Sequence, residues 1–108
     1  MGQTRVTGTG GKDGNGGGED PRVTQLRAAV SRLRRELAGY PAEFTDRGVA
    51  EDELAAMDAM AAAGGVPEIL RLRRSLLLIA GSIGSVSALA TGLAQVRIAV
   101  ELFGEGKS

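Results

Sequence analysis

The chain has 108 residues, with 13 Lys and Arg against 13 Asp and Glu, and it contains neither cysteine nor histidine. This length allows one domain, and the balanced charge provides no net attraction for nucleic acid, so we expect no nucleic-acid partner. The missing residue types exclude disulfides, thiolate metal sites and the commonest general base, and we expect no metal and no cofactor.

Glycine dominates the first 19 residues, which hold eight of the 17 glycines in the chain and almost no apolar side chain. Such a segment cannot bury enough apolar surface to offset the entropy lost on ordering. We therefore predict a disordered glycine-rich tail over residues 1–19, followed by an all-helical domain over residues 20–104.

The first predicted helix spans about residues 21–39 and opens with Asp20 as its N-cap and Pro21 at the first helical position. Apolar residues then recur at spacings of three and four, which is typical of one face of a helix. They are Val23, Leu26, Val30, Leu33, Leu37 and Tyr40. Gly39 marks the end of this helix.

The second helix is predicted over about residues 50–63, and Phe44 in the loop before it is expected to pack back onto the core. The acidic run 51–53 would lie in its first turn, where the helix dipole favours anions. A thin apolar stripe follows, made by Leu54, Met57 and Ala61. Gly64 and Gly65 are expected to stop this helix.

The third predicted helix runs over residues 67–103, or about 55 Å at 1.5 Å per residue. Its apolar residues follow a heptad repeat, as in a coiled coil. The seam comprises Leu72, Leu76, Ile79, Ile83, Val86, Ala90 and Leu93. The sequence therefore predicts an all-α fold, a small three-helix bundle or helical hairpin with one long C-terminal helix.

Residues 75–96 form a stretch of 22 residues without a charge, which admits two interpretations. In the first, the long helix is the spine of a soluble homo-oligomer, most simply a twofold dimer. Leu77 and Leu78 add apolar bulk away from the seam, and small residues on the same helix would let a second helix approach closely. The predicted self-association ridge comprises Gly81, Gly84, Ser85, Ala88 and Gly92.

In the second interpretation, residues 75–96 are a transmembrane helix, because about 33 Å is enough to cross a hydrocarbon core of about 30 Å. The arginines that precede this segment would leave the N-terminal portion inside the cell. The first interpretation is favoured, since the apolar pattern continues past Arg97 and the segment has no aromatic belt.

A short motif, Arg-Leu-Arg-Arg-Glu-Leu at residues 32–37, recurs as Arg-Leu-Arg-Arg-Ser-Leu at residues 71–76. The simpler interpretation is that arginine suits the flanks of an apolar helix seam. The functional alternative is a pair of basic docking patches for anionic partners. These patches would consist of Arg32, Arg34, Arg35, Arg71, Arg73 and Arg74.

Three stretches carry a resemblance to a known family. They are Asp20-Pro-Arg-Val-Thr, Leu33-Arg-Arg-Glu-Leu and Arg71-Leu-Arg-Arg-Ser-Leu-Leu-Leu-Ile-Ala-Gly-Ser-Ile-Gly-Ser-Val-Ser-Ala-Leu-Ala. Over about residues 20–104 the chain resembles a family of small uncharacterised actinobacterial proteins known only as a domain of unknown function. That resemblance implies no activity, cofactor or catalytic residue.

Candidate catalytic groups are few, and the best of them are the carboxylates Glu51, Asp52, Glu53 and Asp58. A solvated, dipole-favoured helix start explains these carboxylates, so we do not expect an enzyme. We expect a cytoplasmic, non-enzymatic helical protein–protein interaction or oligomerisation module. The alternative is a single-span protein of the plasma membrane that associates through its Gly/Ala ridge.

Overall fold

The computed structural model describes residues 20–105, so the prediction of a disordered tail over residues 1–19 lies outside the described residues. Four α-helices make up the described part, which contains no strand. They are α2 (Pro21–Gly39), α3 (Arg47–Ala62), α4 (Ile69–Ile83) and α5 (Ala90–Glu105), with a short 3-10 turn, η1 (Ser87–Leu89), before α5. The fold class is all-α as predicted, but with four helices in place of three.

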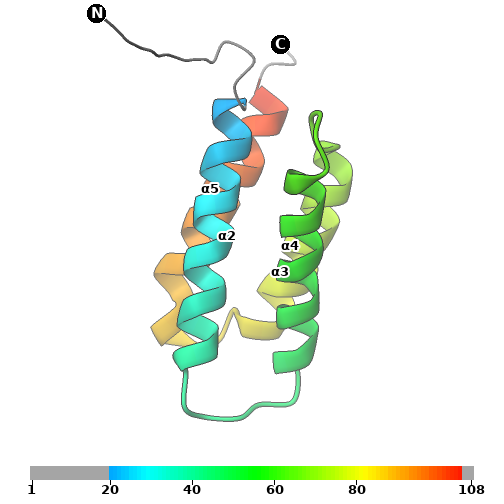
Figure 1. The fold of residues 1–108 in the computed structure, drawn as a ribbon. Coiled ribbons are helices and arrows are strands. Elements are labelled where there is room, and N and C mark those ends of the chain that lie inside the picture. The colour runs from blue at the N-terminus through cyan, green and yellow to red at the C-terminus, as the bar shows by residue number, and fades with distance from the viewer. Residues whose placement is uncertain (1–19, 106–108) are drawn as a thin grey trace, which may run out of the picture.

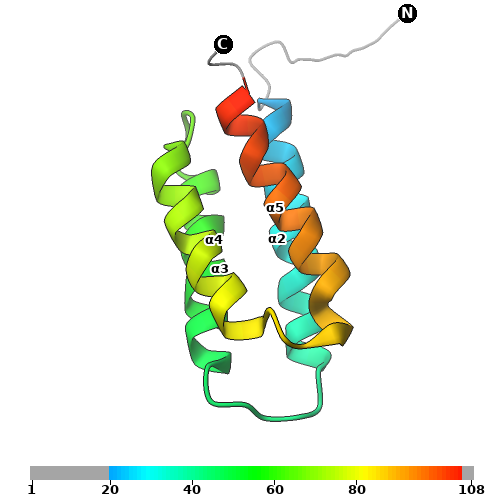
Figure 2. The ribbon, with the colours of Figure 1, turned by 180° about the vertical axis from the view of Figure 1, so that it is seen from behind.

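Successive helices run in opposite directions, and the four form a closed ring (Figures 1 and 2). Each helix packs against two neighbours, and the most extensive contacts join α3 to α4 and α2 to α5. The bundle therefore consists of two helix pairs, the α2–α5 pair and the α3–α4 pair, that face each other across one core.

The prediction of one long helix over residues 67–103 is wrong, because the chain reverses direction between α4 and α5. Gly84 ends α4 and donates its N–H to the Ala80 carbonyl at 2.8 Å. Val86 is extended and donates to Ile83 at 2.9 Å, after which η1 leads into α5. A Cβ at Gly84 would lie against the carbonyl oxygen of Ala80, so this tight turn requires glycine.

The reversal follows from the need to cover the apolar seam. A straight helix of about 55 Å would extend well beyond α2 and α3, which are about 28 Å and 24 Å long. Folding back instead places the second half of the seam, including Val96, Val100 and Phe103, in the same core as Leu72 and Ile79. Both halves of the seam are thereby buried within a single chain.

The start of α2 is set by local residues, as predicted. The Asp20 side chain caps the helix by accepting the Arg22 backbone N–H at 2.8 Å, and Pro21 occupies the first helical position. The Arg22 guanidinium also donates to Asp20, at 2.7 Å, and these hydrogen bonds hold the pKa of the Asp20 carboxyl below its ordinary value.

The second helix, α3, begins at Arg47, three residues earlier than predicted. The Arg47 side chain is largely buried and donates to the carbonyls of Leu37, Tyr40 and Ala42, which fixes the loop between α2 and α3. Phe44 lies half-buried against the core, as expected. At the other end, α3 stops before Gly64 and Gly65, which both adopt a positive φ of 82°.

The core is built from aliphatic side chains, with Phe103 as its buried aromatic residue. Each such side chain contributes about 1.5–3 kcal/mol when it is fully buried. The largest fully buried side chains are Leu26, Val30, Leu33, Leu37, Leu54, Met57, Leu72, Ile79, Ile83, Leu89, Val96 and Val100.

Candidate interaction surface

The outer face of α4 contains a row of apolar side chains although it faces away from the core. Leu70 and Leu77 each expose 73% of their surface, and Leu78 is also exposed. Leu70, Leu77 and Gly81 follow each other at spacings of seven and four, so they lie on one side of the helix, opposite the buried Leu72 and Ile79. A row of exposed leucines indicates an interaction surface, whereas a single exposed leucine is common on monomeric proteins.

The outer face of α3, beside this row, is formed by small apolar side chains. The exposed alanines are Ala55, Ala56, Ala59 and Ala62 of α3 and Ala63 at its C-cap. Between α3 and α4 lies a shallow groove of about 550 Å³, which is lined by several of these alanines together with Met60 and Leu78. We call the outer surfaces of α3 and α4 together the α3–α4 face.

Unpaired charges lie on the α3–α4 face. On α4, Arg71 and Arg74 are exposed and form no ion pair within residues 20–105. On α3, the exposed Asp52 likewise has no ion-pair partner in this described part of the chain. The two arginines also border the groove, where Glu53 accepts a hydrogen bond from Ser75 at 2.9 Å.

The remaining acidic residues of α3 are engaged in local pairs. Glu51 pairs with Arg47 at 3.3 Å, and Asp58 pairs with Arg34 of α2 at 3.6 Å. Within residues 20–105, no group of three His, Cys, Asp or Glu side chains is placed to hold a metal ion. The Asp58 pair thus connects α3 to α2, whereas the Glu51 pair lies within α3.

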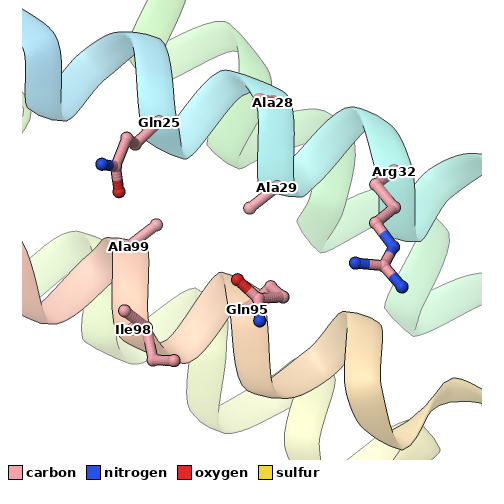
Figure 3. A pocket seen from close by; sticks show the side chains of 7 residues that line it. All are labelled: Gln25, Ala28, Ala29, Arg32, Gln95, Ile98 and Ala99. Carbon is pink, nitrogen blue, oxygen red and sulfur yellow. The ribbon is translucent and has the colours of Figure 1, made fainter.

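The groove between α2 and α5 is smaller than the groove between α3 and α4. It has a volume of about 300 Å³. Figure 3 shows that Gln25 and Arg32 of α2 and Gln95 of α5 extend into the space between the two helices, beside the small side chains of Ala29 and Ala99. Amide and guanidinium groups on this side suit contact with water.

The five residues of the predicted self-association ridge do not share one helix. Gly81 lies exposed on α4, while Gly84, Ser85 and Ala88 lie in the turn region that joins α4 to α5. Gly92 is buried in α5, where a Cβ would meet the Glu36 carboxylate and, at 3.0 Å, Leu33 Cδ1 of α2. The single straight ridge is therefore wrong in its geometry, because it rested on an unbroken helix; self-association itself stays a prediction.

The two arginine clusters lie on α2 and on α4, which are not neighbours in the ring of helices (Figure 1). Three of the six arginines are paired: Arg32 with Glu36 at 3.2 Å, Arg34 with Asp58, and Arg73 with Glu101 at 2.7 Å. The hydrogen bonds from Arg73 hold the pKa of Glu101 below its ordinary value. The clusters thus do not combine into one basic site.

No helix within residues 20–105 is long and apolar enough to cross a membrane. The alternative of a transmembrane helix over residues 75–96 is wrong, because the turn around Gly84 divides this stretch into the end of α4 and the beginning of α5. Each part contributes side chains to the bundle core.

Leu77 and Leu78 were noted from the sequence, but Leu70, which lies on the same side of α4 as Leu77, was missed. The signal was present in the spacing of seven between Leu70 and Leu77. This signal was missed because the predicted long helix would have been buried on every side, and no single face of it could be identified as the outer one.

The geometry defines a small all-α protein, an antiparallel four-helix bundle with a row of exposed leucines on α4. The chain matches the model of a family of unknown function, DUF5955, over residues 15–104, and it belongs to this family. This confirms the resemblance to a domain of unknown function. No curated protein and no solved structure shows a significant match to the chain.

Proposed function

We propose that this protein is a non-enzymatic helical oligomerisation module that pairs with a second copy of itself through the α3–α4 face. The observation that carries the proposal is the row of exposed leucines on α4, with Leu70 and Leu77 each 73% exposed. Folding of a single chain gains nothing from these positions, whereas burial in an interface would gain about 25 cal/mol per Å² of apolar surface.

The size of the face sets the expected affinity. Helices α3 and α4, about 24 Å and 22 Å long and each about 10 Å wide, present roughly 450 Å² per copy, and a pair buries about 900 Å² by this measure. This is below the roughly 1,200–2,000 Å² that stable specific interfaces bury, so we expect a weak, reversible dimer with a Kd on the order of micromolar.

The test is the mass in solution, measured by light scattering after size exclusion at concentrations from about 1 µM to about 1 mM, which bracket that Kd. The wild-type mass is expected to rise from 11.1 kDa toward twice that value. The double variant Leu70→Glu/Leu77→Glu should stay monomeric and helical, since both side chains lie outside the core.

A matched control is Ile98→Glu on α5, which alters a 55% exposed apolar side chain on the α2–α5 pair. This variant should dimerise like the wild type. A wild-type chain that remains monomeric throughout would refute the proposal. So would a dimer that survives Leu70→Glu/Leu77→Glu but is lost with Ile98→Glu, because the interface would then lie on the other pair.

A further inference from the structure

The two helices of the α3–α4 face differ in a complementary way. The outer surface of α4 is bulky and basic, with leucines and the unpaired Arg71 and Arg74, and α4 contains no carboxylate. The outer surface of α3 is small and acidic, with alanines and the unpaired Asp52, and α3 contains four carboxylates against one arginine. Each helix therefore has the shape and charge that the other would accept from a partner.

Resting on the proposed function, we infer that α4 of each copy packs on α3 of the other, with Arg74 of one copy paired to Asp52 of its partner. A twofold axis that runs parallel to the helices, between α3 and α4, produces this arrangement. The alternative twofold, perpendicular to the helices, would place α4 on α4 and so bring two basic helices together.

The heights of the residues along the bundle agree with this arrangement. The hydrogen bond between Ser75 and Glu53 fixes α3 and α4 at one level. Arg74 and Asp52 are each one residue away from this bond, so they lie within about 3 Å of the same height. A rotation about an axis parallel to the helices preserves height, and Arg74 of one copy therefore comes opposite Asp52 of the other.

Two glycines mark where the helices of the two copies would approach most closely. Gly48 of α3 and Gly81 of α4 are exposed, and a Cβ on either would meet nothing within 4 Å in one copy. Gly48 lies five residues from Glu53, and Gly81 lies six residues from Ser75 in the same direction along the bundle. Their heights along the bundle therefore differ by about 1.5 Å. Glycine inside a helix lowers stability by about 1 kcal/mol relative to alanine. Nothing within one copy requires glycine at position 81, whereas close contact with a helix of a second copy would require it.

The test exchanges the two charges. Asp52→Arg alone and Arg74→Asp alone each place like charges together at two symmetric contacts, and each should raise the dimer Kd by about tenfold. In the double variant both pairs are restored with reversed sign, so its Kd should return to within about threefold of the wild-type value. All proteins are compared by sedimentation equilibrium at one ionic strength.

Mixing the two single variants provides a second measurement. In a mixed dimer the new arginine at position 52 meets the new aspartate at position 74, and Arg74 meets Asp52, so both contacts are attractive. Dimers should therefore form in the mixture at concentrations where neither variant dimerises alone. A mixture of Asp52→Arg with Arg35→Asp is the matched control, because Arg35 on α2 forms no ion pair within residues 20–105. This mixture should form no such dimer.

The outcomes separate this inference from the proposed function. If the wild type dimerises and Leu70→Glu/Leu77→Glu abolishes the dimer, but neither the double variant nor the mixture restores it, this arrangement is overturned and the oligomerisation proposal stands. If the wild type is monomeric, the oligomerisation proposal fails, and the arrangement fails with it.

Discussion

The α2–α5 pair and the α3–α4 pair share one core but present different surfaces to their surroundings. On the α2–α5 pair the outward positions are mainly arginine, glutamine and other polar residues, and Ile98 is its exposed large apolar side chain. On the α3–α4 pair they include alanines and leucines beside the charged Asp52, Arg71 and Arg74, and Val49, Leu70, Leu77 and Leu78 are all exposed. The requirements of one folded chain explain the first surface, whereas the second contains apolar side chains that a single chain does not use.

The largest contrast is expected between the two faces of α4. Leu72→Ala removes a fully buried leucine and should lower the free energy of unfolding by about 2–5 kcal/mol. Leu77→Ala alters a side chain outside the core and should change it by no more than about 0.5 kcal/mol. Urea unfolding of dilute protein measures both. Equal losses would contradict the assignment of inner and outer faces.

A second contrast compares a glycine in each pair. Gly92→Ala puts a methyl group against Leu33 and the Glu36 carboxylate, and this overpacking should cost about 1–3 kcal/mol of stability. Gly81→Ala meets open space within a helix, and the monomer should become more stable by up to about 1 kcal/mol.

Both variants are compared with the wild type by thermal unfolding at concentrations at which the protein is monomeric. The unfolding temperature should fall for Gly92→Ala and rise for Gly81→Ala. Stabilisation by Gly92→Ala would contradict the close packing of α5 on α2. A loss of stability in the Gly81→Ala monomer would show that Gly81 has a role within one chain.

The smallest contrast concerns the helix starts. Asp20 caps α2 with its side chain, whereas Asp46, at the corresponding position before α3, forms no such hydrogen bond. Asp20→Ala should therefore cost about 1 kcal/mol of stability, and Asp46→Ala should stay within about 0.5 kcal/mol of the wild type. Chemical denaturation midpoints distinguish them; matching losses would show that Asp46 stabilises α3 by another route.

How far the sequence predicted the structure depended on whether the signals were local. The cap at Asp20 and the apolar stripe that follows fixed α2 correctly, because each signal acts within a few residues. The early start of α3 was missed because Arg47 is held by carbonyls of the preceding loop, which only the folded chain brings near. Composition and periodicity were sufficient for the helical class.

The turn between α4 and α5 could not be predicted from periodicity, since the heptad pattern continues through it. Gly84 with the neighbouring serines was a weak signal against a helix. The decisive factor is the length of α2 and α3, because these helices are too short to cover the apolar seam of an unbroken helix. The candidate surface was missed in part for the same reason, because an outward face of α4 exists only once the inward face is known.

The ring of four helices has a consequence for the order of the chain. The start of α2 and the end of α5 lie side by side, where the Arg22 guanidinium sits 5.2 Å from the centre of the Phe103 ring (Figure 1). A short linker between them would make the backbone a closed circle, and opening it at Gly64 and Gly65 would retain every helix and its neighbours. The bundle thus accommodates circular permutation, and the covalent sequence of its helices is one of several that produce the same packing.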